Sequence, residues 1–166
     1  ILPNNGSCVL DDLCTFSLEK MIQAKKRKIG IVFNLDKHYQ SGSHWVSMFI
    51  DIPNKFIFFF DSADNNIPPE IWKPSKKTKE GVEIKEGVEI KEGVEIKEGG
   101  EIKDPLVNRI IQQGLELKTP IYFTFYNNSG ISHQQTNTEC GMYSLFFIIT
   151  MLTGKTPFTK GKLSAK

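Results

Sequence analysis

The chain has 166 residues, of which 39% are hydrophobic and 24% are charged, and these values are typical of one globular domain with a buried core. Its formal net charge of +2 is too small to indicate a nucleic acid or an anionic membrane as partner. No apolar stretch reaches the roughly 20 residues of a membrane-spanning helix, so we expect no membrane span.

The cysteines and histidines indicate neither a disulfide framework nor a metal site. The three cysteines, Cys8, Cys14 and Cys140, form no Cys-x-x-Cys pair, and the three histidines lack the spacing of metal ligands. We therefore expect a reducing, intracellular location, no metal and no cofactor. Because the chain begins at Ile1 rather than at a methionine, we also expect an upstream region to be missing.

The hydrophobic pattern predicts a mixture of helices and strands. In chain order the expected elements are a helix over 10–26, a buried strand over 28–35, strands over 44–51 and 55–61, a helix over 105–117, a strand over 120–127 and a buried helix over 140–152. The tight connection "IPN" joins the second and third strands into an antiparallel hairpin. This mixture around a central hairpin predicts an α+β fold.

Between these elements the sequence changes character at about 75–104. "EGVEIK" occurs three times and is followed by "EGGEIK", which together fill residues 80–103. The period of six is compatible with a β-helix, but four units offer little surface for stacking. Balanced charge and low complexity favour a flexible surface insertion without a catalytic role. We therefore expect a single domain over 1–166 that carries this insertion.

Three separated residues are candidates for a catalytic triad. Cys140 stands where a polar loop becomes a helix, and a helix N-terminus favours the thiolate form of a cysteine. His44 begins one strand of the hairpin, and Asp61 ends the other, so the hairpin brings imidazole and carboxylate together. Each residue alone has a structural explanation: a small buried cysteine, a structural or exposed histidine and a turn-capping aspartate.

Other residues near the cysteine support the same chemistry. Gln134 and Gln135 precede Cys140, and a side-chain amide at either position is able to donate to the oxyanion that forms when a thiolate attacks a carbonyl. The alternative for both is a solvent-exposed loop residue. Gly141 follows the cysteine and permits close approach of backbone or substrate.

Taken together, these motifs resemble the SUMO-specific cysteine protease family. They are "HW" at 44–45, "ID" at 50–51, "FDS" at 60–62, and a glutamine six residues before the cysteine of "ECGMYS". Asp61 and Cys140 are 79 residues apart, and 55 remain when the 24 repeat residues are removed, which fits the family. Glu139 replaces the usual aspartate, and the family's Trp-Leu-x-Asp helix start and second tunnel tryptophan are not found.

The resemblance implies a papain-like cysteine protease core, with a central mixed or antiparallel sheet flanked by helices and the nucleophile at a helix N-terminus. Cys140 is then the nucleophile, His44 the general base and acid, and Asp61 its orienting partner. Gln134 is the oxyanion donor, with Gln135 as the neighbouring alternative. Trp45 corresponds to the aromatic wall of a tunnel that admits Gly-Gly, the alternative being a core tryptophan on the hairpin.

The compact form of the chain, with little room for an extended partner surface, resembles more closely the polyprotein-processing proteases of adenovirus and African swine fever virus. We expect a monomeric endopeptidase that cleaves viral structural precursors after Gly-Gly-like motifs, in host cytoplasm and virion. One alternative is a protease that matures or removes SUMO or another ubiquitin-like modifier. Another is a non-catalytic module that binds a ubiquitin-like tail, and a scaffold built on the hexapeptide repeat is the least favoured.

Overall fold

The computed structural model describes residues 11–35, 44–74, 105–134, 136 and 138–154. The chain divides into two compact units, one comprising residues 1–26 and 67–123 and the other comprising residues 27–66 and 124–166. The expected single domain stays a prediction. The repeat at 80–103 lies outside the described residues.

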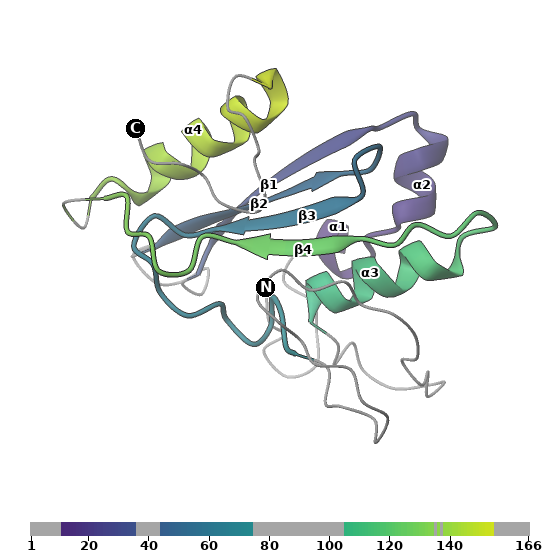
Figure 1. Ribbon diagram of the computed structural model, residues 1–166, viewed down its shortest axis with the longest axis horizontal. Coiled ribbons are helices and arrows are strands. Elements are labelled where there is room, and N and C mark those ends of the chain that lie inside the picture. The colour runs from purple at the N-terminus through teal and green to yellow at the C-terminus, as the bar shows by residue number, and fades with distance from the viewer. Residues whose placement is uncertain (1–10, 36–43, 75–104, 135, 137, 155–166) are drawn as a thin grey trace. The chain divides into compact units, whose positions relative to one another are not determined.

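A mixed four-stranded sheet forms the second unit, with the order β1-β2-β3-β4 (Figure 1). Its strands are β1 (Lys28–Asn34), β2 (Trp45–Asp51), β3 (Phe56–Phe60) and β4 (Thr124–Asn127). β1 and β3 each pair with β2 in antiparallel fashion, whereas β4 runs parallel to β3. The predicted hairpin and the α+β class are therefore confirmed.

The hairpin of β2 and β3 is held in one register by burial and by its turn. Nearly every residue of both strands is buried, including the polar residues Ser47 and Asp51 of β2. At the turn, the Asp51 carboxylate accepts hydrogen bonds from the backbone N–H and the side-chain amide of Asn54, each at 3.0 Å. In this register Ser47 pairs with Phe60, so the chain before β2 and the chain after β3 meet at the same end of the hairpin.

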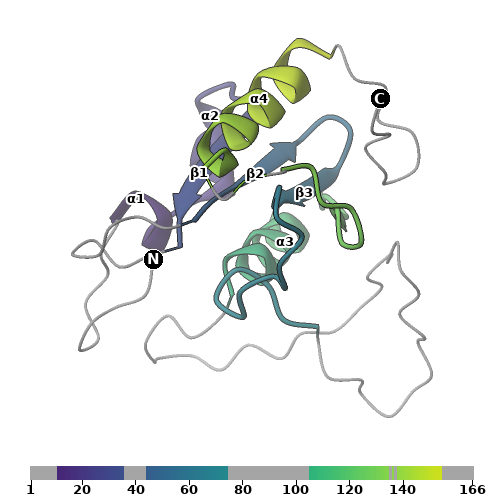
Figure 2. The same ribbon diagram turned by 90° about the vertical axis from the view of Figure 1, so that its left-hand side faces the viewer.

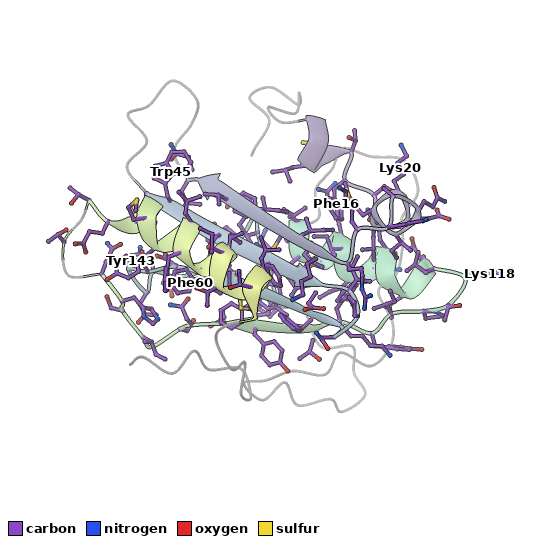
Figure 3. The ribbon with its side chains drawn as sticks, turned by 90° about the horizontal axis from the view of Figure 1, so that it is seen from above. Phe16, Lys20, Trp45, Phe60, Lys118 and Tyr143 are labelled. Atoms are coloured by element: carbon purple, nitrogen blue, oxygen red, sulfur yellow. The ribbon has the colours of Figure 1, made fainter. Side chains whose placement is uncertain are left out.

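Helix α4 (Cys140–Thr153) packs along β1 and β2 (Figure 2). Its inner side joins an aromatic cluster on the sheet, formed by Phe49, Phe56, Phe58, Phe60, Phe147 and Met151. The rings of Phe60 and Phe147 stack with centroids 4.7 Å apart and planes 4° apart. Figure 3 shows Phe60 and Tyr143 beside α4, and because Phe147 is the eighth of the 14 residues of α4, the stack holds the middle of the helix on the sheet.

The first unit contains α1 (Asp11–Cys14), α2 (Leu18–Gln23) and α3 (Leu106–Glu116). The prediction of one helix over 10–26 was wrong, because Ser17 caps a new helix: its hydroxyl accepts a hydrogen bond from the Lys20 N–H at 3.3 Å. Arg109 and Gln113 of α3 satisfy the backbone around this break. Arg109 donates to two carbonyls at the end of α1, and Gln113 accepts from the N–H of Leu18.

Two expected strands also differ from the structure. Only the last four residues of 120–127 enter the sheet, because the N–H of Ile121 donates to Gly114 O at the end of α3 instead. The strand predicted over 28–35 forms as β1, but it is an edge strand, and Phe33 is its only buried residue.

The helix predicted over 140–152 forms but is buried on one side only. Its outer side exposes Met142, Leu145, Phe146, Ile149 and Leu152. This spacing follows the helical repeat, so the two sides of α4 differ in burial although both are apolar. Within the described residues no helix is long and apolar enough to cross a membrane.

Gly30 allows α4 to lie close to β1, and this close approach is testable. A Cβ at position 30 would lie 2.6 Å from Cγ2 of Ile148. We expect Gly30→Ala to lower the free energy of unfolding by about 1–3 kcal/mol, measured by urea denaturation, because the helix must shift. In an Ile148→Ala background, Gly30→Ala should lower the free energy of unfolding by a clearly smaller amount. Equal losses in the two backgrounds would contradict this contact.

Candidate active site

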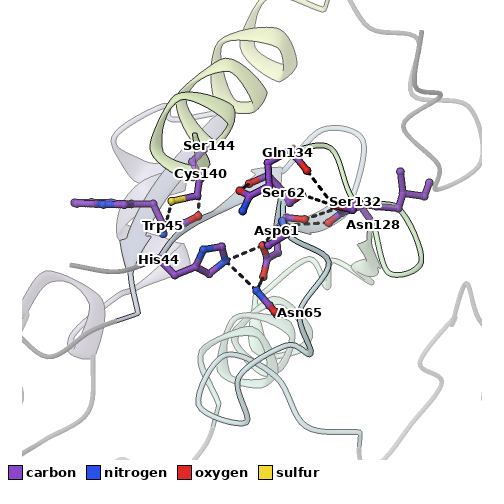
Figure 4. Close-up of polar contacts among 12 residues, drawn as sticks. His44, Trp45, Asp61, Ser62, Asn65, Asn128, Ser132, Gln134, Cys140 and Ser144 are labelled. Atoms are coloured by element: carbon purple, nitrogen blue, oxygen red, sulfur yellow. Dashed lines mark hydrogen bonds and ion pairs between the residues drawn. The ribbon is translucent and has the colours of Figure 1, made fainter. Parts of the chain in front are cut away.

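His44 and Asp61 form a hydrogen-bonded pair at the end of the hairpin (Figure 4). His44 Nε2 lies 2.8 Å from Asp61 Oδ1, and the Asp61 side chain is 4% exposed. Because an ionised carboxylate only accepts hydrogen bonds, Nε2 carries the proton in this pair. The Nδ1 atom of the neutral imidazole is then the nitrogen that is able to take up a proton.

Two further donors fix the Asp61 carboxylate. The Ala63 N–H donates to Oδ1 at 2.8 Å, and the Asn65 side-chain amide donates to Oδ2 at 3.2 Å. Asn65 Nδ2 also lies 3.3 Å from His44 Nε2. Since Nε2–H already donates to Asp61, this approach is a contact between two donor atoms. Asp61 therefore caps its turn and holds the imidazole, so both interpretations of this residue apply.

Asn128, which the sequence did not indicate, holds the backbone of Asp61. Its Oδ1 accepts from the Asp61 N–H at 2.9 Å, and its Nδ2 donates to the Asp61 carbonyl at 2.7 Å. Nδ2 also donates to the carbonyl of Ile131. Asn128 is 4% exposed and follows β4 directly, so it joins the ends of the two parallel strands.

Cys140 is the first residue of α4 and is 4% exposed. Its Sγ accepts a hydrogen bond from the backbone N–H of Trp45 at 3.4 Å, and Trp45 directly follows His44. One turn further along α4, the Ser144 hydroxyl donates to the Trp45 carbonyl at 3.1 Å. Both backbone groups of Trp45 are thus bonded to α4, which places the thiol beside the backbone of His44.

The thiol and the imidazole are neighbours without a direct hydrogen bond in the part of the chain that the structure describes. Such catalytic contacts are often long without substrate and shorten when it binds. The Trp45 N–H donates to Sγ, and Cys140 is the first residue of α4, where the backbone N–H groups have no partner within the helix. The arrangement therefore suits proton transfer from Cys140 to Nδ1 of His44.

Gln134 lies in the loop that leads to α4 and is attached to the end of the hairpin. Ser62 O accepts the backbone N–H groups of His133 and Gln134 at 2.8 and 3.1 Å, and the Ser62 hydroxyl donates to Gln134 Oε1 at 2.7 Å. No hydrogen bond joins Gln134 Nε2 to the described residues. In Figure 4 the Gln134 side chain extends toward the Cys140 side of the site, so Nε2 is available as an oxyanion donor.

Of the three residues predicted to bind substrate, the structure describes Trp45 and Gly141. Trp45 is 38% exposed, so the alternative of a core tryptophan was wrong. Its indole extends away from the pair of His44 and Asp61 (Figure 4), and a Cβ at Gly141 would lie 3.8 Å from it. Gln135 lies outside the described residues. Their roles in binding substrate stay predictions.

The described residues contain no group of three or more histidines, cysteines, aspartates or glutamates that could hold a metal ion. The charged and nucleophilic groups of the site instead form one row, from Asp61 through His44 to the thiol of Cys140 (Figure 4). A carboxylate, an imidazole and a thiol in this order are the components of nucleophilic catalysis by cysteine.

Comparison with known proteins agrees with this chemistry. The chain is 28% identical over 148 residues to R355 of Acanthamoeba polyphaga mimivirus, which is named a thiol protease, and the match covers 88% of this chain. It is 26% identical over 131 residues, or 78% of this chain, to the SUMO-1 cysteine protease S273R of African swine fever virus. The homologues of this chain are viral cysteine proteases. The predicted resemblance is confirmed, although no family model matches the chain.

The chain spans only about a third of the length of these relatives, 37% of R355 and 36% of S273R. Among solved structures, the African swine fever virus pS273R protease is 27% identical, with a TM-score of 0.47 over 76% of this chain and 35% of that one. The SUMO protease Ulp1 is 16% identical, with a TM-score of 0.46 over 90% of this chain and 52% of that one.

His133 makes the loop before Cys140 sensitive to pH. Burial lowers the pKa of His133 below 6.5, and the Asp64 carboxylate offsets only part of this effect. Its Nε2 is buried without a hydrogen-bond partner in the described part of the chain, and its ring packs on Phe60 at 5.3 Å between centroids. Protonation would place a charge in this apolar contact.

We therefore expect acid to destabilise the fold through His133. Below about pH 6.5 the unfolded chain binds a proton that the folded chain resists, so the free energy of unfolding falls as the pH decreases. His133→Phe, which keeps an aromatic ring beside Phe60, should lose less stability between about pH 7.5 and pH 5 in urea denaturation. Identical losses for wild type and variant would show that His133 makes no such contribution.

Proposed function

We propose that this chain is a cysteine endopeptidase in which Cys140 is the nucleophile, His44 the general base and acid, Asp61 its orienting partner and Gln134 the oxyanion donor. The observation that carries the proposal is the 2.8 Å contact between His44 Nε2 and Asp61 Oδ1. The Cys140 thiol lies beside this pair, because its Sγ accepts a hydrogen bond from the backbone N–H of Trp45, the residue after His44. The viral thiol proteases among the relatives support the same activity.

The reaction follows from the positions of these groups. Nδ1 of His44 takes the thiol proton, and the Cys140 thiolate attacks the scissile carbonyl carbon. The N–H of Cys140, one of the free N–H groups at the start of α4, and Nε2 of Gln134 donate to the resulting oxyanion. Imidazolium then gives its proton to the leaving amine, and water hydrolyses the thioester with His44 as base.

For the substrate, the proposal is a viral structural precursor cleaved after a Gly-Gly-like motif. Its support is the viral origin of the relatives and the partly exposed indole of Trp45 beside Gly141. A flat aromatic surface next to the nucleophile suits an extended segment of small residues, because such a segment lies close to the ring without side-chain clashes.

A second candidate is a protease for SUMO or another ubiquitin-like modifier. The relative from African swine fever virus is named a SUMO-1 cysteine protease, which favours this version. The triad geometry is compatible with both substrates, since both present an extended tail. A non-catalytic binding module has less support, because recognition of a tail does not require a buried carboxylate bonded to an imidazole beside a thiol.

The peptidase proposal predicts selective reaction of one cysteine. A peptide that ends in Gly-Gly and carries a thiol-reactive electrophile should label Cys140, because its thiol lies beside the imidazole pair. Mass spectrometry should find no labelling in Cys140→Ala and a labelling rate about 10²–10⁴-fold lower in His44→Ala, which removes the general base.

Matched variants separate this result from ordinary thiol reactivity. Cys14 is disulfide-bonded in the structure, so the labelling is carried out after reduction, and Cys8→Ser and Cys14→Ser should then label at the wild-type rate. Labelling spread equally over the three cysteines would overturn the proposed function. Release of a fluorophore from Gly-Gly-x peptides and from a SUMO fusion, compared at equal concentration, then distinguishes the two substrate classes.

A further inference from the structure

Ser62 is completely buried, and its polar groups are directed at the loop that carries Gln134. Its carbonyl accepts the N–H groups of His133 and Gln134, and its hydroxyl donates to Gln134 Oε1 at 2.7 Å. Because Ser62 directly follows Asp61, one short segment after β3 holds both the imidazole and the side chain that faces the nucleophile.

The hydroxyl of Ser62 decides which end of the Gln134 amide faces the site. The carboxamide group has an acceptor oxygen and a donor nitrogen, and rotation by half a turn exchanges them. The separation of 2.7 Å is typical of an O–H···O bond, whereas an N–H···O bond is usually about 2.9–3.0 Å. With Oε1 bonded to Ser62, Nε2 is turned away from Ser62 and lacks a partner among the described residues.

We propose that Ser62 is a positioning residue that holds the Gln134 amide in the orientation that presents N–H to the oxyanion. This inference rests on the proposed function, because it concerns the same oxyanion. In the opposite orientation, Oε1 would face the developing negative charge and raise the barrier.

The test compares hydrolysis with alkylation of the same thiol. Ser62→Ala should lower kcat for a Gly-Gly-x peptide by about 10-fold with little change in KM, because the oxyanion forms only during the chemical step. The rate of Cys140 alkylation by iodoacetamide should be unchanged, since alkylation forms no oxyanion. A purely structural disturbance of the site would slow both reactions.

A double-mutant cycle shows whether Ser62 acts through Gln134. Gln134→Ala should lower kcat by about 10²–10³-fold, and adding Ser62→Ala should cause no further loss. Ser62→Thr keeps the hydroxyl and should retain most of the activity, which covers the case that the alanine variant is poorly folded. Ser132→Ala is the matched control, because the Ser132 hydroxyl lies 3.4 Å from the carbonyl oxygens of Ser62 and Gln134 and makes no bond to the Gln134 side-chain amide.

The possible failures are distinguishable. An active wild-type chain with an unaffected Ser62→Ala variant overturns the inference and leaves the proposed function intact. The inference is also overturned if Ser62→Ala lowers kcat equally in the wild-type and Gln134→Ala backgrounds. It is overturned as well if Ser62→Ala lowers the rate of Cys140 alkylation together with kcat. A wild-type chain that neither hydrolyses the peptide nor reacts selectively at Cys140 overturns the proposed function together with the inference.

Discussion

The hydrogen bond between His44 and Asp61 determines what this site is able to do. Because the carboxylate accepts a hydrogen bond from Nε2–H, Nδ1 is left to take up a proton, and the imidazolium that would form during a reaction has a buried counter-charge at 2.8 Å. The bond requires β2 and β3 to keep their register, since a slip by one residue would turn the side chains of one strand to the opposite face. The apolar hairpin is therefore a condition of the chemistry.

The positions of the Cys140 thiol and of Gln134 depend on contacts outside the pair of His44 and Asp61. Stacking of Phe60 on Phe147 places α4 on the sheet, and α4 binds both backbone groups of Trp45, so the thiol and the imidazole are positioned by the same strand. Ser62 extends this organisation to the loop of Gln134. The proposed base, nucleophile and oxyanion donor thus all depend on the end of one hairpin where β2 begins and β3 ends.

The sequence predicted the hairpin, α3, α4 and the convergence of His44, Asp61 and Cys140, because these features depend on local apolar patterns and on motif spacing. It did not predict Asn128, since an asparagine in "YNNSG" has the signature of a turn and its bonds to Asp61 depend on the parallel pairing of β3 and β4. The break at Ser17 was missed because the apolar spacing continues across it, and the exposed side of α4 was missed because both of its sides are apolar.

The central claim is that His44 carries its proton on Nε2 and keeps Nδ1 as the base. Nitrogen-15 NMR of the imidazole rings at neutral pH tests it directly, with His38→Gln and His133→Gln to assign the three histidines. The account predicts that the neutral form of the His44 ring is the Nε2–H tautomer, and that this preference is lost in Asp61→Ala. A His44 protonated at Nδ1 alone, or tautomers unaffected by Asp61→Ala, would contradict it.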